Sequence, residues 1–302
     1  MEELPKGESR NIKFLKLLLK IAVTLVCLWY VSKKIDFSKA GKALQNANVI
    51  YLLLALLAFI ISKWISALRL KLYFSNIGIH LNPLQNLKLY WLGMFYNLFL
   101  PGAISGDAYK VVLLSKNYKL SYKKTTSAVL LDRFSGLLGL GLLLAVYGTI
   151  VLKDNWLILL LLAGAATAVL VLYLLVKKIF RDFVPSFFST LLLGIAVQAC
   201  QVVCVYLIMA ALNIPVHTTE YIFIFLVSSV VAVLPLTIGG LGAREIVFLE
   251  GSRYFDLIQE NSVLISIIFY LITVFTSAFG LIYVFRNPLK EIKDKKLSSD
   301  NR

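Results

Sequence analysis

The sequence predicts an all-α polytopic membrane protein with six transmembrane helices and two opposed re-entrant hairpins in an inverted repeat. Three observations support this fold class: the composition, the length of the apolar runs, and two apolar segments that are interrupted by proline. Of the 302 residues, 59% are hydrophobic and 16% are charged, and the mean hydropathy is +0.82. Soluble domains usually carry about 25% charged residues, so this composition excludes a soluble globular fold.

The net charge of +15 arises from 31 Lys and Arg against 16 Asp and Glu. These cations lie in short segments between apolar runs, where cations set membrane topology and contact anionic lipid headgroups. We therefore expect no nucleic-acid partner. The two histidines, His80 and His217, are far apart and have no cysteine or carboxylate cluster at ligand spacing, so we expect no metal and no cofactor.

Six apolar runs are long enough for a transmembrane helix, which needs about 20 residues. The first run, at about 14–31, contains Lys16 and Lys20 and is followed by Lys33 and Lys34 instead of a small-residue cleavage site. We therefore expect a retained helix there and not a signal peptide. The other five spans are expected at about 49–70, 125–152, 156–176, 187–212 and 262–285.

Two further apolar segments are interrupted near their middle. Pro101 interrupts the segment 84–116, and Pro235 interrupts the segment 221–250. Because proline removes a helical hydrogen bond, neither segment is expected to form one straight helix. Lysines and arginines flank the first segment on both sides, whereas carboxylates flank the second. By the positive-inside rule, the first segment has two cytoplasmic ends and the second has two external ends, so each is expected to be a re-entrant hairpin.

A cytoplasmic N-terminus gives a consistent path through the membrane and also leaves the basic tail 287–302 in the cytoplasm. We expect a single membrane domain over 1–302, with repeat halves at about 14–152 and 156–286, in the inner (cytoplasmic) membrane of a bacterium or archaeon. The segment 33–48 departs from this scheme because its four lysines would lie outside. Its apolar spacing predicts a short amphipathic helix at the membrane interface.

The two interrupted segments align when one is shifted by 134 residues, so that 100–106 faces 234–240 and Lys110 faces Arg244. At the aligned positions, both segments have a leucine, a proline, an isoleucine, a glycine and a cation. In transporters with inverted repeats, broken helices at corresponding positions meet near the bilayer midplane and form the transport site. The alternative is two unrelated proline kinks. The residues expected at the hairpin tips are Pro101, Gly106, Pro235, Gly239 and Gly240.

Charged side chains inside the apolar segments need an explanation, because a central Asp, Lys or Arg costs about 2.5 to 3.5 kcal/mol on insertion. Arg133 and Arg244 are expected to bind a lipid phosphate, since a guanidinium donates two parallel hydrogen bonds to phosphate oxygens. Asp107 and Glu245 are expected to bind a cationic headgroup, take up a coupling proton or orient the arginines. Asp132 and Lys110 complete the candidate set. The alternative is that these charges only pair with one another to hold the hairpins.

Several short motifs stand at the two interrupted segments and in the span between them: Asn97-x-x-Leu100-Pro101, Gly106-Asp107, Asp132-Arg133, Leu234-Pro235 and Gly239-Gly240-Leu241-Gly242-x-Arg244-Glu245. In these motifs the chain resembles the transmembrane domain of lysylphosphatidylglycerol synthases, a family also described as flippase-like. The resemblance covers nearly the whole chain and adds Asn97 to the substrate-binding candidates. The chain departs from the family pattern at Ser105, where glycine is usual, and at Lys110, where arginine is common. A lysine does not make the bidentate contact of a guanidinium.

The resemblance implies a lipid translocase that moves an anionic, aminoacylated or polyprenyl-phosphate lipid between leaflets by alternating access. In larger family members, a cytosolic domain transfers an amino acid from charged tRNA to phosphatidylglycerol. Residues 287–302 are too short for that domain, so we expect no enzyme activity. The alternative is a phosphatidylglycerol lysyltransferase-type lipid-modifying enzyme, or its membrane subunit or anchor. The expected partner is a membrane lipid, with a separately encoded lipid synthase and a second copy of the chain as further options.

Overall fold

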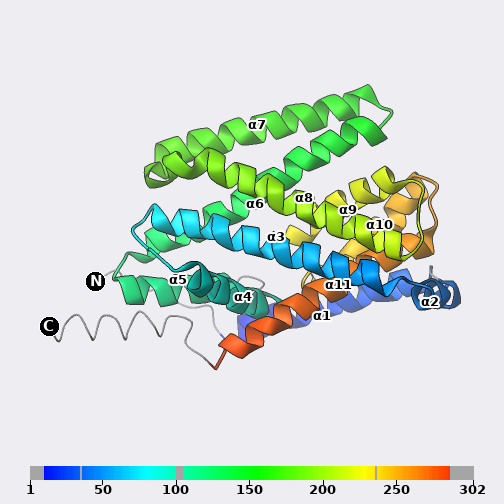
Figure 1. The fold of residues 1–302 in the computed structure, drawn as a ribbon, viewed down its shortest axis with the longest axis horizontal. Coiled ribbons are helices and arrows are strands. Elements are labelled where there is room, and N and C mark those ends of the chain that lie inside the picture. The colour runs from blue at the N-terminus through cyan, green and yellow to red at the C-terminus, as the bar shows by residue number, and fades with distance from the viewer. Residues whose placement is uncertain (1–9, 35, 100–104, 235–236, 286–302) are drawn as a thin grey trace.

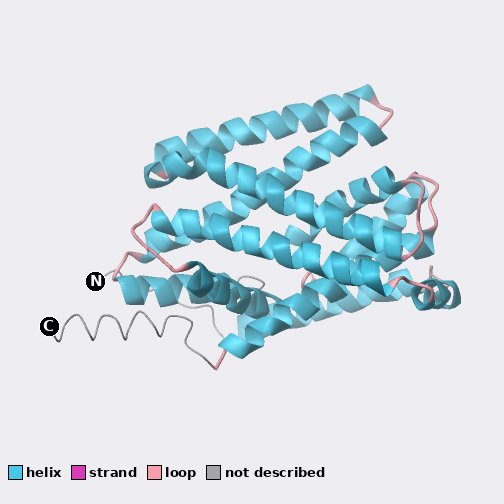
Figure 2. Ribbon diagram, in the orientation of Figure 1, coloured by secondary structure: helices cyan, strands magenta, loops and turns pink. Residues whose placement is uncertain are grey.

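The secondary structure consists of helices joined by short loops, with no strand in the described part of the chain (Figure 2). The all-α prediction is therefore confirmed. A chain in a bilayer must satisfy its backbone hydrogen bonds internally, and helices do so within one segment. The computed structural model describes residues 10–34, 36–99, 105–234 and 237–285.

Five helical segments of the described chain are long and apolar enough to cross a membrane. They coincide with five of the six expected spans. At the position of the first expected span lies α1 (Arg10–Ser32), within which Ile21–Ser32 is a shorter apolar segment. The protein is therefore a multi-pass membrane protein. The five segments are α3 (Val49–Ser75), α6 (Tyr122–Val151), α7 (Asn155–Ile179), η1 (Arg181–Ser186) with α8 (Phe187–Ala211), and α11 (Gln259–Ala278) with η2 (Phe279–Tyr283).

The helix α7 lies at the edge of the bundle (Figure 1). Its side chains include exposed leucines such as Leu159 and Leu170, which are 56% and 57% exposed. A helix that is apolar all round and not covered by protein is suited to contact with lipid chains. This edge of the bundle therefore faces the hydrocarbon of the bilayer.

Two pairs of shorter helices stand at opposite ends of the bundle (Figure 1). The helices α4 (Pro83–Phe99) and α5 (Ser105–Tyr118) pack against each other at the end where α3 finishes and α6 begins. The helices α9 (Thr218–Val233) and α10 (Ala243–Tyr254) do so at the end where α8 finishes and α11 begins. The order of one long, two shorter and one long helix thus occurs twice.

The expected hairpin tips at Pro101 and Pro235, and the tail 287–302, lie outside the described residues. The residues on either side of the tips approach each other closely. A Cβ atom placed on Gly239 would lie 2.4 Å from Leu98 Cδ1, so the residues before α10 touch the end of α4. The two helix pairs therefore meet inside the bundle.

A short helix, α2 (Phe37–Gln45), occupies the segment in which an amphipathic helix is predicted. Asp36 caps it by accepting hydrogen bonds from the backbone N–H groups of Ser38 and Lys39, at 2.9 and 3.3 Å. The Lys39 ammonium lies 3.9 Å from Glu260 at the start of α11. This end of the bundle is the one that carries α9 and α10 (Figure 1).

Aromatic rings join three helices in the interior. The Phe269 ring of α11 contacts Phe59 of α3 at 5.5 Å and Phe225 of α9 at 4.8 Å between ring centroids, in both cases edge to face. All three side chains are at most 3% exposed. Edge-to-face pairs add about 0.5 to 1.5 kcal/mol each to the free energy gained by burial. The two halves of the chain therefore share one core.

The backbones of α6 and α8 touch through glycine. A Cβ atom on Gly139 would lie 2.6 Å from the carbonyl carbon of Gly194, which is closer than real Cβ atoms approach. Small residues allow such contacts between membrane helices, where dispersion forces replace the hydrophobic effect as the source of attraction. This contact holds α6 and its charged residues against α8.

We expect Gly139→Leu to lower stability, because overpacking a close contact costs about 1 to 3 kcal/mol. The measurement is the temperature at which half of the detergent-solubilised protein remains monodisperse. Gly141→Leu is the matched control on the same helix, since nothing lies within 4 Å of a Cβ atom there. Equal midpoints for the two variants would contradict the α6–α8 contact.

Candidate functional site

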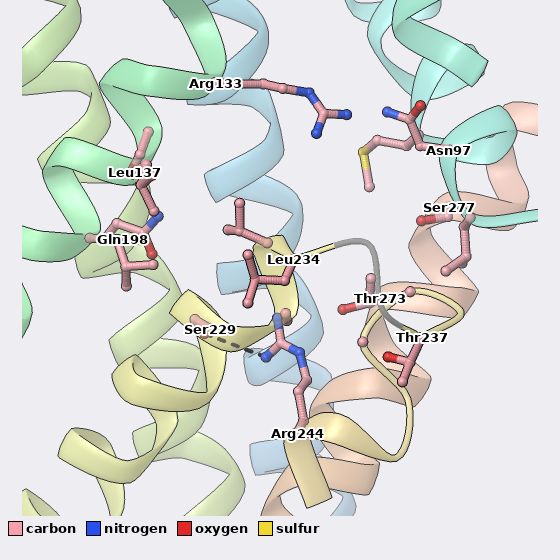
Figure 3. A pocket seen from close by; sticks show the side chains of 18 residues that line it. Asn97, Arg133, Leu137, Gln198, Ser229, Leu234, Thr237, Arg244, Thr273 and Ser277 are labelled. Atoms are coloured by element: carbon pink, nitrogen blue, oxygen red, sulfur yellow. Dashed lines mark hydrogen bonds between the residues drawn. The ribbon is translucent and has the colours of Figure 1, made fainter. Parts of the chain in front are cut away.

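A cavity of about 390 Å³ lies where the two pairs of short helices meet (Figure 3). Its wall is formed by residues of α4, α6, α8, α9, α10 and α11, together with the segment before α10. Both halves of the chain therefore contribute to one cavity. The residues named in Figure 3 are Asn97, Arg133, Leu137, Gln198, Ser229, Leu234, Thr237, Arg244, Thr273 and Ser277.

The structure places Arg133 and Arg244 in the wall of this cavity. Arg133 extends into it from α6 at one end, and Arg244 extends into it from the first turn of α10 at the other end (Figure 3). The Arg133 side chain is 40% exposed. Guanidinium groups are suited to bidentate contacts with anions such as phosphate, and two of them face this cavity.

Asp107 holds Arg133 in place. Its carboxylate pairs with Arg133 Nε through Oδ2 and accepts a hydrogen bond from Lys110 Nζ through Oδ1 at 2.9 Å. Asn97 Nδ2 lies 3.5 Å from the same Oδ1, and Asn97 Oδ1 accepts the backbone N–H of Gly106 at 2.8 Å. Of the three roles left open for Asp107, orientation of an arginine is the one that this geometry fits.

Lys110 lies behind the cavity and not in its wall. Its side chain passes over Gly93 of α4, where an added Cβ atom would lie 2.2 Å from Lys110 Cε. The ammonium lies 5.1 Å from the centroid of the Tyr90 ring, and the residue is 4% exposed. An added Cβ atom on Gly106 would lie 2.0 Å from Gly93 O, so α4 and α5 are in backbone contact. Lys110 therefore belongs to the packing of this helix pair.

Asp132 also lies outside the cavity wall. It pairs with Arg69 of α3, whose Nε lies 2.8 Å from Asp132 Oδ1, and both side chains are nearly buried. Sequence reasoning missed Arg69, because a cation near the end of an apolar run is typical of a membrane boundary. The pair links α3 to α6.

Glu245 is fully buried, with 0% of its surface exposed. Its carboxylate accepts the backbone N–H of Gly242 and the hydroxyl of Ser266, the latter at 2.8 Å. The first contact satisfies a backbone donor at the start of α10, and the second joins α10 to α11. The structure therefore gives Glu245 a capping role and brings Arg244, its neighbour in sequence, to the cavity.

Arg244, which is part-buried, has a different environment from the buried cations Arg69 and Lys110, each of which pairs with a carboxylate. Its guanidinium carbon lies 5.1 Å from the centroid of the Phe269 ring, and Nη1 donates to Ser229 Oγ at 3.4 Å. No carboxylate among the described residues lies within 4.0 Å of its guanidinium. Gly240, at a φ of +85°, leaves room for the side chain, since a Cβ atom there would lie 3.1 Å from Arg244 Nε. Gly239 and Gly240 both line the cavity.

Over residues 17–280 the sequence matches the family described as the lysylphosphatidylglycerol synthase TM region. The chain belongs to this family. The resemblance drawn from the motifs is thereby confirmed, and all seven substrate-binding candidates lie inside the matched range. This membership supports a membrane role related to lipids.

The chain is also similar to a UPF0104 membrane protein of Pyrococcus horikoshii. The two are 25% identical over 170 residues, which are 56% of this chain. The match covers 50% of that protein, so the chain spans about half the length of this relative.

We expect Asp132→Asn to destabilise this member of the synthase TM family strongly, because it leaves the Arg69 guanidinium buried without its counter-ion. Removing one partner of a buried pair costs about 3 to 5 kcal/mol. Asp182→Asn is the matched control, since Asp182 pairs with Lys124 at 3.1 Å on the surface, where a pair is worth less than about 1 kcal/mol. Thermal midpoints in detergent test this, and a shift no larger for Asp132→Asn than for the control would argue against the buried pair.

Proposed function

We propose that the protein is a lipid translocase that moves a phosphate-bearing lipid between the leaflets of the cytoplasmic membrane by alternating access. The observation that carries this proposal is the cavity with two arginines, one contributed by each half of the chain. The lipid is moved without a change in its covalent structure. Both termini then lie in the cytoplasm, as the positive-inside rule predicts.

The arrangement of the short helices supports this proposal. The pairs α4–α5 and α9–α10 stand at opposite ends of the bundle, and their inner ends meet at Leu98 and Gly239. Each pair is a re-entrant hairpin in this account, with α1 as the sixth span. In transporters built this way, movement of one repeat against the other exposes a central site to each side in turn.

The surroundings of the cavity favour a lipid over a water-soluble anion. A second cavity of about 430 Å³ lies between α6 and α7 and is lined almost entirely by apolar residues. Leu137 lies in the wall of both cavities. A headgroup bound to the arginines can therefore place its acyl chain beside α7, at the edge of the bundle that faces the bilayer. A soluble anion would gain nothing from this apolar space.

Translocation of headgroup-labelled lipid in proteoliposomes tests the proposal, with mass spectrometry of the same lipids. We expect Arg244→Gln to reduce the rate about tenfold or more, because it removes a charge-assisted hydrogen bond to the phosphate. Arg253→Gln is the matched control on the same helix, since Arg253 pairs with Glu250 at the surface end of α10.

Unchanged lipid masses, with transport lost only in Arg244→Gln, are the expected result. A protein-dependent change in lipid mass would make the protein a lipid-modifying enzyme. Transport by Arg244→Gln at the rate of the wild type would remove this arginine from the site.

A further inference from the structure

The three carboxylates near the cavity are all engaged with donors of the protein. Asp107 binds Lys110 and Arg133, Asp132 binds Arg69, and Glu245 binds Gly242 N–H and Ser266. Among the described residues that line the cavity there are two arginines and no carboxylate. The wall thus offers no negative group to a cationic ligand.

A third cation adds to the positive charge around the cavity. Lys63, near the middle of α3, places its ammonium 4.4 Å from the centroid of the Phe59 ring. The Phe59 ring packs edge to face on the Phe269 ring. The Arg244 guanidinium lies over the same Phe269 ring. Within the described part of the chain, no carboxylate pairs with Lys63. Because a low-dielectric interior screens charge weakly, the ammonium group of a ligand in this cavity would be repelled.

The neutral part of the wall has unused hydrogen-bonding atoms. In the described structure, Gln198 Oε1 and Thr237 Oγ1 have no hydrogen-bond partner, although the two residues are 9% and 3% exposed. They lie on opposite sides of the cavity, with Gln198 at a level between the two arginines and Thr237 toward the end at which Arg244 lies (Figure 3). Buried polar atoms are almost always hydrogen-bonded, so these two atoms indicate a polar ligand. A hydroxyl group both donates and accepts and therefore fits both atoms.

We infer that the cavity selects lipids whose headgroup carries one phosphodiester and uncharged hydroxyl groups, and that it discriminates against aminoacylated, cationic headgroups. The phosphate lies between Arg133 and Arg244, and the hydroxyl groups bind Gln198 and Thr237. This inference rests on the proposed function in that the ligand is taken to be a lipid.

Three lipids with the same acyl chains separate the two parts of the inference. Phosphatidylglycerol has a single negative charge and two hydroxyl groups in its headgroup. Phosphatidylethanol has the same charge and no hydroxyl, and lysylphosphatidylglycerol has a net positive charge. Competition among them for the detergent-solubilised protein, measured by native mass spectrometry, gives relative affinities without any transport step.

We expect phosphatidylglycerol to bind about tenfold more tightly than phosphatidylethanol, and lysylphosphatidylglycerol to bind most weakly. Thr237→Val retains the shape of the side chain. We expect it to weaken the binding of phosphatidylglycerol and to leave the binding of the other two lipids unchanged. Equal or tighter binding of lysylphosphatidylglycerol would overturn the charge selection. Equal binding of phosphatidylglycerol and phosphatidylethanol would overturn the role of the hydroxyl groups. Both comparisons use the wild-type protein, so they hold even where a variant does not fold.

Lipid binding and lipid transport are measured separately, so their results separate the selectivity from the translocase activity. Selective binding of phosphatidylglycerol by a protein that moves no lipid supports the selectivity and contradicts the translocase. Transport with a preference for lysylphosphatidylglycerol supports the translocase and contradicts the selectivity.

Discussion

The carboxylate of Asp107 holds together the parts that form the cavity. It binds Lys110 of its own helix and Arg133 of α6, and Asn97 of α4 lies against it. A carboxylate or a guanidinium alone in this interior would be costly, whereas each lowers the cost of the other. The pair α4–α5 is therefore fixed to α6, and Arg133 is held at the cavity. Without this interaction, neither the position of the α4–α5 pair nor that of the Arg133 guanidinium would be defined.

The cost of an unpaired charge in the interior also explains the roles of the remaining charged residues. Asp132 and Arg69 pair with each other, and Glu245 caps its own helix, so these groups stabilise the bundle. The Arg244 guanidinium instead lies over the Phe269 ring and donates a hydrogen bond to the Ser229 hydroxyl. Under the proposed function, a lipid phosphate bound beside Arg244 is the counter-ion of this guanidinium. In the proposed translocase, this ion pair would stabilise the state that encloses the lipid, because a ligand shifts an equilibrium toward the state that it binds more tightly.

Local sequence signals predicted much of this structure. Run length predicted six spans, and five of them coincide with helical segments long and apolar enough to cross a membrane. The prolines predicted the two interrupted segments, because this property too is carried by neighbouring residues. The cost of charge inside apolar segments led to the expectation that Arg133 and Arg244 bind one phosphate, and both residues line the cavity. The sequence did not reveal that Asp132 pairs with Arg69, since 63 residues separate them and the contact depends on how α3 and α6 cross. Nor did it reveal the unused atom of Thr237, which follows from packing in three dimensions.

The proposed function requires that the cavity open to each side of the membrane in turn. Thr273 lies in the cavity wall on α11 and provides a position for a single cysteine, once Cys27, Cys200 and Cys204 are replaced by serine. The most direct measurement is labelling of Thr273→Cys in proteoliposomes by a membrane-impermeant maleimide, added on one side or on the other. Alternating access predicts labelling from either side, and protection when phosphatidylglycerol is added. Labelling from only one side, with or without lipid, would contradict the account.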